Sequence, residues 1–129
     1  MQHESLLTAR VSFLDGDAAV GKIRGLAQGL LIRHPEVTAV ILFGSLARGD
    51  YAPGSDADLL LFLDSDKRRL IDRIPDYLRE FLDAPVPVEV FPYTKDEVDR
   101  MRASGNHFIE RALREGVTLA ERSFEERLK

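Results

Sequence analysis

The sequence predicts an α/β protein of the α+β type, in which helices flank a small mixed β-sheet. Three observations predict this fold class. Apolar residues recur at helical spacing between residues 17 and 33. Three runs rich in β-branched and apolar residues follow at 37–43, 58–63 and 86–91, and these read as strands. Helical patterns and turn-forming loops separate the runs, which is typical of helices packed on a sheet.

Length and composition favour one small domain, covering residues 1–129 with a core from about residue 17 to residue 120. The net charge of −4 argues against a nucleic-acid partner held by a broad basic surface. The absence of cysteine excludes a disulfide framework, a thiol nucleophile and a cysteine-based zinc site. No apolar run is long enough for a membrane span and no signal-peptide pattern is present, so we expect no membrane partner and a cytoplasmic location.

The first helix is expected to end at His34-Pro35, because the residue before a proline avoids the helical region. The strand at 37–43 follows, and Gly44-Ser45 interrupts it. Residues 46–49 are sufficient for one helical turn, and residues 50–55 are turn-forming types throughout.

The second strand, at 58–63, leads into a helix with an apolar face from Leu70 to Leu82. Asp64-Ser65-Asp66 is expected to cap this helix at its N-terminus. Pro75 lies inside the apolar pattern, so we expect the helix to be kinked or split there.

Pro87 lies in the third predicted strand and has no N–H, so one side of that strand is expected to be unpaired. Thr94 is expected to cap a short helix after the strand. A further helix over 106–115 is expected to end at Gly116 in the left-handed conformation. Residues 117–120 complete the pattern as a short last strand.

Two aspartates at the start of the second strand are the first candidate site residues. Asp56 and Asp58 share one face of the strand, about 6.5 Å apart at roughly 3.3 Å per residue. If the first two strands are antiparallel, this pair meets Gly44-Ser45 at one edge of the sheet. Two carboxylates so close repel each other unless a cation lies between them. Ligands that are all oxygen suit Mg²⁺.

The other half of the candidate site would bind an anion. Gly44 allows close approach of the backbone to a ligand, Ser45 offers a hydroxyl donor, and Arg48 can form paired hydrogen bonds with phosphate. Glu89 is an isolated acid in the third apolar strand, where burial is costly without a partner. If that strand pairs with the second one, Glu89 joins the aspartates. It could then help to hold a second metal, or take a proton from an attacking hydroxyl.

These motifs resemble those of a known family. Gly44-Ser45, ten intervening residues, Asp56-Ala57-Asp58 and a later Val88-Glu89-Val90 are similar to the nucleotidyltransferase superfamily typified by DNA polymerase beta. The stretch 43–61 is most similar to the minimal nucleotidyltransferases, and the resemblance extends from about residue 20 to residue 120. It implies a DNA polymerase beta-like nucleotidyltransferase fold. The implied activity is Mg²⁺-dependent transfer of a nucleoside monophosphate, AMP from ATP, to an acceptor hydroxyl.

The resemblance also implies roles for individual residues. The metal ligands and catalytic residues would be Asp56, Asp58 and Glu89, holding two Mg²⁺ ions, and the triphosphate would be bound by Gly44, Ser45 and Arg48. The chain departs from the family pattern at two positions. Leu46 stands where many relatives carry a basic residue, and Glu89 replaces the commoner aspartate.

Minimal nucleotidyltransferases are often encoded beside a small all-helical HEPN protein, and several such pairs resemble a toxin and its antitoxin. The resemblance therefore implies a nucleoside triphosphate as substrate and a HEPN-type protein as partner, and it leaves homo-oligomerisation open. An alternative is a catalytically silent antitoxin that acts by contact with its helical partner. Taken singly, Gly44-Ser45 also fits a plain turn, the aspartates fit caps, and Glu89 fits an acid facing water. Their combination favours a nucleotidyltransferase site.

Overall fold

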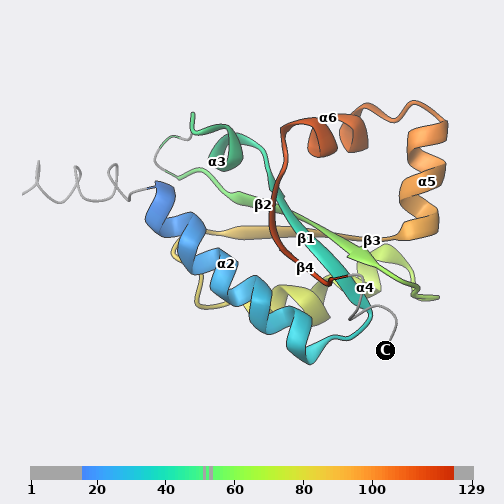
Figure 1. Cartoon of the computed structure of the whole chain (residues 1–129), viewed down its shortest axis with the longest axis horizontal. Coiled ribbons are helices and arrows are strands. Elements are labelled where there is room, and N and C mark those ends of the chain that lie inside the picture. The colour runs from blue at the N-terminus through green and yellow to red at the C-terminus, as the bar shows by residue number, and fades with distance from the viewer. Residues whose placement is uncertain (1–15, 51, 53, 124–129) are drawn as a thin grey trace, which may run out of the picture.

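A four-stranded sheet forms the centre of the protein, for which the computed structural model describes residues 16–50, 52 and 54–123. The strands are β1 (Val37–Phe43), β2 (Ala57–Leu63), β3 (Val88–Thr94) and β4 (Val117–Glu121), in the order β3-β2-β1-β4 (Figure 1). β1 is antiparallel to both β2 and β4, whereas β2 is parallel to β3. The sheet is therefore mixed, as predicted.

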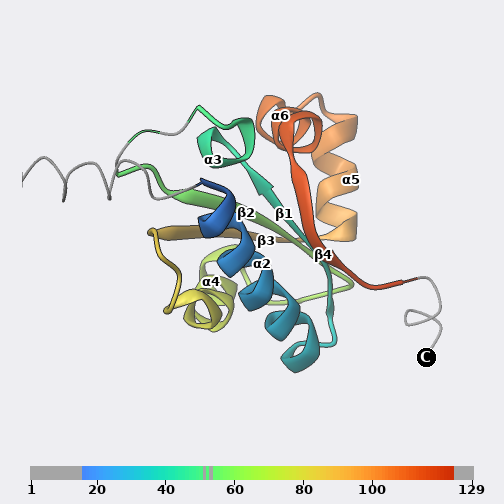
Figure 2. The ribbon, with the colours of Figure 1, turned by 60° about the vertical axis from the view of Figure 1, so that its left-hand side comes forward.

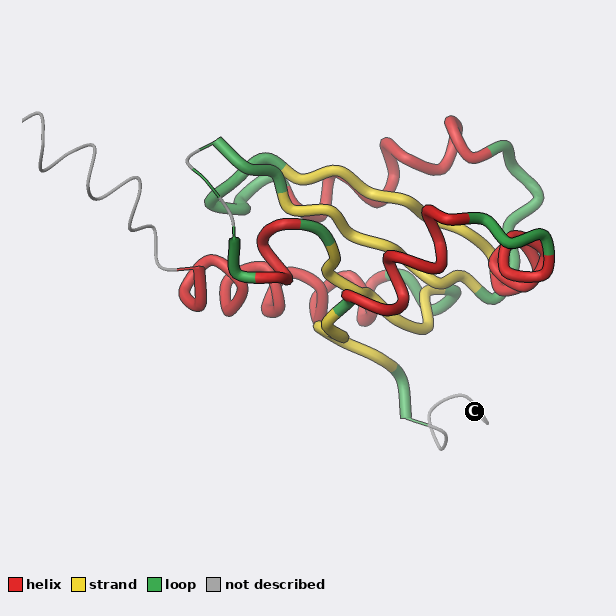
Figure 3. Tube along the Cα trace, turned by 90° about the horizontal axis from the view of Figure 1, so that it is seen from above, coloured by secondary structure: helices red, strands yellow, loops and turns green. Residues whose placement is uncertain are grey.

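The described helices lie on both faces of this sheet. They are α2 (Gly16–Arg33), α3 (Ser45–Arg48), α4 (Leu70–Leu78), the 3-10 helix η1 (Arg79–Phe81), α5 (Lys95–Ala103) and α6 (His107–Glu115). α2 and α4 cover one face, and α5 and α6 cover the other (Figure 2). Seen from above, the strands run between these helical layers (Figure 3, strands in yellow). None of the described helices is long and apolar enough to cross a bilayer.

The apolar run of β2 is continuous because both faces of the strand are covered. Leu59 and Leu61 are buried in the larger core, against α2 and α4. Leu60 points the other way, into a smaller core with Ile109 of α6 and Val98 of α5. Because successive side chains of a strand alternate between faces, a strand between two helical layers shows no polar alternation.

The predicted Thr94 cap is confirmed, and α6 has a cap that was not predicted. Thr94 accepts a hydrogen bond from the backbone N–H of Glu97, whose side chain in turn accepts one from the Thr94 N–H, forming a capping box. Asn106 caps α6 by accepting from the Ile109 N–H at 3.1 Å. Both helices therefore begin within one residue of the predicted positions.

The start predicted for α4 is wrong, and of the two alternatives given for Pro75, a kink or a split, the split is wrong. The helix begins at Leu70, after Arg69 in the N-cap position, rather than directly after Asp64-Ser65-Asp66. Asp66 instead accepts hydrogen bonds from the backbone N–H and the guanidinium of Arg68, so its carboxylate is not available to cap a helix. Pro75 does not split the helix, which continues through it to Leu78.

The third strand lies two to three residues later than predicted. β3 starts after Pro87, whose carbonyl accepts a hydrogen bond from the Ala57 N–H at 2.8 Å. Pro92 lies inside β3, where a missing N–H is tolerated because β3 is an edge strand.

The predicted left-handed stop at Gly116 is also wrong, because its φ is −71°. A side chain there would collide with Ile41 and with the Ala112 carbonyl, so close packing explains the glycine. In the loop predicted over 50–55, Tyr51 and Pro53 lie outside the described residues.

Candidate active site

The sheet brings three separate segments together at one edge. Asp58 of β2 lies opposite Phe43, the last residue of β1, and Gly44 follows Phe43 directly. On its other side, Asp58 is in register with Glu89 of β3. Side chains at paired positions of neighbouring strands point to the same face, so Asp58 and Glu89 lie side by side. The predicted antiparallel and neighbouring pairings are both confirmed.

The acids lie on the face of the sheet that α5 and α6 partly cover. Asp58 lies two residues before Leu60, so the two side chains share a face of the sheet, and Leu60 packs under α6. Asp56 lies two residues before Asp58, on the same side. Asp58 is half-buried, whereas Asp56 and Glu89 are exposed. Partial burial raises the pKa of the Asp58 carboxyl above its ordinary value, and the charges of Glu89 and Asp56 raise it further. The three carboxylates therefore act electrostatically as one cluster.

Gly44 approaches this cluster more closely than any residue with a side chain could. Its φ is +83°, which residues other than glycine rarely adopt. A Cβ atom built on Gly44 would lie 2.5 Å from the Oδ2 atom of Asp58. Backbone conformation and space thus independently require glycine at this position.

A single helical turn, α3, follows Gly44 directly. The Arg48 N–H donates to the Gly44 carbonyl at 3.1 Å, and the Gly49 N–H donates to the Ser45 carbonyl at 3.0 Å. N–H groups of a first helical turn have no acceptor within their own helix. Within the described part of the chain, the Ser45 hydroxyl also has no hydrogen-bond partner. This turn therefore offers free donors beside the carboxylates.

Leu46, the position at which many relatives carry a basic residue, is buried. Its side chain is 7% exposed and packs in the core beneath α3. The departure from the family pattern is therefore a core contact, which fixes α3 against the sheet from below.

Arg48 lies near the acids and is held by two other carboxylates. Its Nε donates to Asp50 at 3.1 Å and its Nη1 donates to Glu115, the last residue of α6, at 2.9 Å. Its positive charge lowers the pKa of Asp58, against the larger opposing effects of burial and the neighbouring acids. Sequence reasoning missed Glu115, because nothing in the sequence connects two residues 67 positions apart.

The carboxylates provide oxygen ligands but do not converge on one point. In the described ranges, no three His, Cys, Asp or Glu side chains are placed so that they could hold a metal ion together. Asp56 and Glu89 form no ion pair within the same ranges, so neither is held away from Asp58 by another group.

Comparison with known proteins gives one family match. Residues 23–119 match the profile of a family described as the nucleotidyltransferase domain. Comparison with curated protein sequences gives no significant match.

Several solved structures share the fold. A protein of Sulfolobus solfataricus, crystallised as a candidate nucleotidyltransferase, is 21% identical with a TM-score of 0.61, over 83% of this chain and 84% of that one. A toxin–antitoxin structure with AMP-PNP is 19% identical with a TM-score of 0.56, over 81% and 78% of the two chains. A double aspartate-to-glutamate variant of the toxin–antitoxin pair MntA-HpeT is 17% identical with a TM-score of 0.56, over 81% and 78%.

Proposed function

The chain belongs to the nucleotidyltransferase domain family and is a nucleotidyltransferase, and on this basis we propose that it transfers AMP from ATP to an acceptor hydroxyl with Mg²⁺ as cofactor. The observation that carries this proposal is the register of the sheet edge. It places Asp58 between Glu89 on one neighbouring strand and the Gly44 turn at the end of the other. Nucleotidyl transfer needs charge neutralisation and positioning of phosphate groups, and this edge combines acids with free donors.

The donor set fits a hard divalent cation. Asp56, Asp58 and Glu89 would be its ligands, and they supply oxygen atoms only, as Mg²⁺ prefers. Burial and, to a smaller extent, the repulsion from Glu89 and Asp56 raise the pKa of Asp58, and repulsion of this kind is relieved by a bound cation. When bound, Mg²⁺ would neutralise charge on the triphosphate and on the departing pyrophosphate.

The chain's own residues would bind and orient the substrates. The backbone after Gly44 and the hydroxyl of Ser45 would donate hydrogen bonds to the triphosphate. Arg48 would add a positive charge at the phosphates, exchanging part of its present contact with Asp50 and Glu115. Glu89 would accept the proton of the acceptor hydroxyl. The oxygen of that hydroxyl would bond to the α-phosphorus as the bond from phosphorus to pyrophosphate breaks.

The proposed acceptor lies on a small all-helical HEPN-type partner, for which this protein would act as antitoxin in the cytoplasm. The toxin–antitoxin complexes among the structural neighbours support a protein partner, and the AMP-PNP in one of them supports an adenine nucleotide.

Label transfer from ATP tests the catalytic proposal. The purified protein, Mg²⁺ and ATP labelled at the α-phosphate are incubated with the helical partner, and label on the partner is measured. Asp58→Asn should reduce the rate by about two orders of magnitude or more, whereas the exposed Asp83→Asn should not. Mg²⁺-ATP binding without label on the partner would contradict the proposed acceptor. Absence of Mg²⁺-ATP binding would contradict ATP as the substrate.

The second candidate function is an antitoxin that works by contact alone. The separation of the three carboxylates in the structure favours it, since they do not form a three-ligand group within the described residues. Cells that express the toxic partner distinguish the two functions. If a double variant with Asp56→Ala and Asp58→Ala still protects them, contact is sufficient. If the double variant no longer protects the cells but still binds the partner, nucleotidyl transfer is required for protection.

A further inference from the structure

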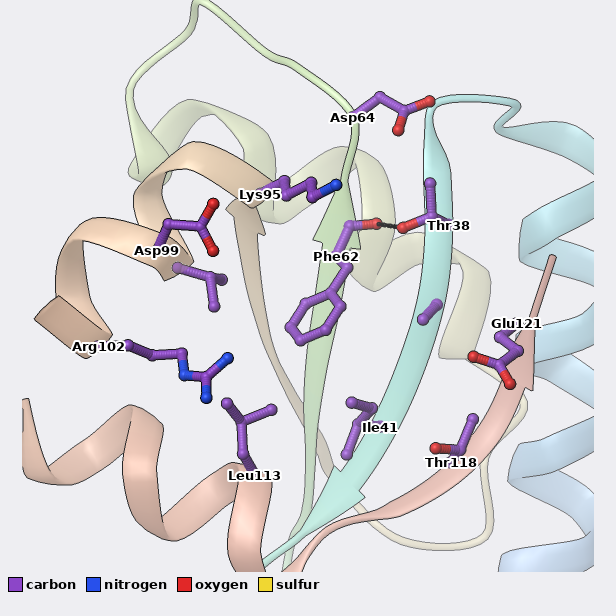
Figure 4. A pocket seen from close by; sticks show the side chains of 12 residues that line it. Thr38, Ile41, Phe62, Asp64, Lys95, Asp99, Arg102, Leu113, Thr118 and Glu121 are labelled. Atoms are coloured by element: carbon purple, nitrogen blue, oxygen red, sulfur yellow. Dashed lines mark hydrogen bonds between the residues drawn. The ribbon is translucent and has the colours of Figure 1, made fainter. Parts of the chain in front are cut away.

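A cavity of about 380 Å³ lies on the same face of the sheet as the carboxylate cluster, at the other end of β2 (Figure 4). β1 and β2 form its floor, α5 forms one wall and β4 the opposite wall. Phe62, which lines the cavity, follows Asp58 by four residues, or about 13 Å at 3.3 Å per residue. Leu60 lies between them under α6. The cavity is therefore separate from the candidate active site.

The floor of the cavity is apolar. Ile41, Phe62 and Leu113 line it, and each remains partly exposed to solvent. Small-molecule sites typically have volumes from about 300 to 1,000 Å³ and mostly apolar walls. This cavity is at the lower end of that range, so it suits a ligand with one small apolar body.

The wall formed by α5 carries unpaired charge. Lys95, Asp99 and Arg102 are spaced so that they share one face of the helix, and all three line the cavity. Opposite charges at these spacings commonly pair along a helix. Within the described part of the chain, however, none of the three forms an ion pair or a side-chain hydrogen bond. Lys95 and Arg102 extend toward the strands (Figure 4). Because two cations and one carboxylate line the cavity from α5, this wall has a net positive charge.

Two further acids line the cavity away from α5 (Figure 4). Asp64 follows the end of β2, and Glu121 ends β4. Both side chains are exposed, and neither has an ion-pair partner among the described residues. The cations of the cavity therefore lie on α5, on either side of Asp99, and two further carboxylates lie at the ends of β2 and β4.

We propose that this cavity binds a small zwitterion with an apolar body, of the class of apolar α-amino acids. The ligand carboxylate would face Lys95 and Arg102, and its ammonium group would face Asp64. Its apolar side chain would cover Phe62. The site is spatially distinct from the proposed nucleotide site, because its lining residues include none of the active-site candidates.

Backbone amide chemical shifts, followed by NMR during ligand titration, test the proposal. The three probes are L-phenylalanine, N-acetyl-L-phenylalanine, which lacks the ammonium charge, and L-phenylalaninamide, which lacks the carboxylate. L-phenylalanine should shift the amides of Thr38, Ile41 and Leu113 in a saturable way. Each derivative should bind about two- to fivefold more weakly, as the loss of one exposed charge pair predicts.

Two pairs of variants locate the charges. Arg102→Gln should weaken binding of L-phenylalanine but not of its amide, and Asp64→Asn should weaken binding of L-phenylalanine but not of the acetyl derivative. The matched controls are Arg100→Gln, on α5 outside the cavity, and Asp83→Asn, after η1, and both should bind as the wild type does. Equal binding of either derivative by the wild type, shifts centred on Gly44 and Ser45, or absence of saturable shifts would each overturn the proposal.

Discussion

Gly44 follows the end of β1, and Asp58 lies beside it near the start of β2. Each of the two residues restricts what the other position can accommodate. The Asp58 carboxylate occupies the space that a side chain at residue 44 would need. The positive φ of Gly44 in turn directs the chain into α3, with its free N–H groups beside that carboxylate. The distance between the acids and the proposed phosphate-binding turn therefore depends on this one contact.

Gly44→Ala should lower both stability and transferase activity. Gly44 has φ +83° and ψ −160°, a conformation essentially restricted to glycine. It costs a residue with a Cβ about 1–3 kcal/mol, and the new methyl group must also displace Asp58. Gly49→Ala is the matched control, because Gly49 has a φ of +82° with open space around its Cβ position. Urea denaturation should show a loss for both variants, while transfer assays should show a large loss only for Gly44→Ala. Equal activity losses would contradict the role of the contact.

Asp58→Asn should stabilise the folded protein at neutral pH. The folded-state pKa of Asp58 lies above its ordinary value of 3.8, so the charged carboxylate destabilises the fold above that folded pKa. This destabilisation fades as the pH falls toward 3.8. The gain should be about 0.2–1 kcal/mol at pH 7, since water screens this half-exposed group. Denaturation from pH 7 to pH 3.5 should show the advantage disappearing, with Asp83→Asn as the control. A constant advantage would indicate another cause.

The candidate site residues stand out in the local sequence pattern, but the contacts that hold them in place do not. Asp56, Asp58 and Glu89 interrupt apolar strands at positions where only a partner or water explains an acid. The contact of Arg48 with Glu115 joins two distant segments, and no local pattern carries that information. The burial of Leu46 likewise depends on how α3 lies on the sheet.

At the scale of secondary-structure elements, a buried arginine joins three of them. Arg73 of α4 is 3% exposed and donates to both carboxylate oxygens of Glu97, at 2.7 Å and 3.0 Å. It also donates to the Pro92 carbonyl of β3 and to the carbonyls of Asp66 and Arg68. The segment before α4 is therefore held as an irregular loop, which explains why the helix starts later than its acidic residues predicted.

Glu97→Gln should destabilise the protein by about 2 kcal/mol, less than the 3–5 kcal/mol for a fully buried pair because the Glu97 side chain is 28% exposed. Hydrogen bonds from Arg73 lower the pKa of Glu97 to about 2. Its stabilising contribution is therefore complete above the ordinary value of 4.5 and is lost as the pH falls toward 2. Urea denaturation between pH 5 and pH 2.5 should show a steeper loss for the wild type than for the variant. Thr94→Ala, which removes only the cap, should retain the steep dependence.

Elements with a strong periodic or capping signal were predicted closely. β1 has the predicted bounds, because a β-branched run between a proline and a glycine allows no other reading. β3 was misplaced because Pro87 and Pro92 each fit an edge strand, and only pairing with β2 decides which of them is inside it.

At the scale of the whole molecule, one arginine ties the last strand to the first helix. Arg122 follows β4, and its guanidinium donates to the carbonyls of Leu31, His34 and Val37. The last carbonyls of a helix lack partners within the helix, and Arg122 satisfies that of Leu31 in α2 and that of His34 directly after it. These hydrogen bonds hold the end of β4 against residues 31–37, which precede it by 85 or more positions.

Arg122→Ala should lower the free energy of unfolding by about 1–3 kcal/mol, because it leaves partly buried carbonyls unsatisfied. Arg122→Lys should restore only part of the loss, since an ammonium group does not reproduce the guanidinium fork. Arg111→Ala, an exposed change on α6, should remain within about 0.5 kcal/mol of the wild type. Guanidinium denaturation measures all three variants, and no loss in Arg122→Ala would show that water replaces the contacts.

The last turn of α6 contacts both the cavity and the candidate active site. Leu113 lines the cavity, and Glu115, two residues later, holds Arg48 beside the carboxylates. If an occupant of the cavity shifts this turn and alters nucleotide affinity by some factor, the nucleotide must alter the affinity of that occupant by the same factor. One titration in each direction would therefore measure the same coupling free energy, and unchanged affinities in both titrations would show that this turn does not connect the two sites.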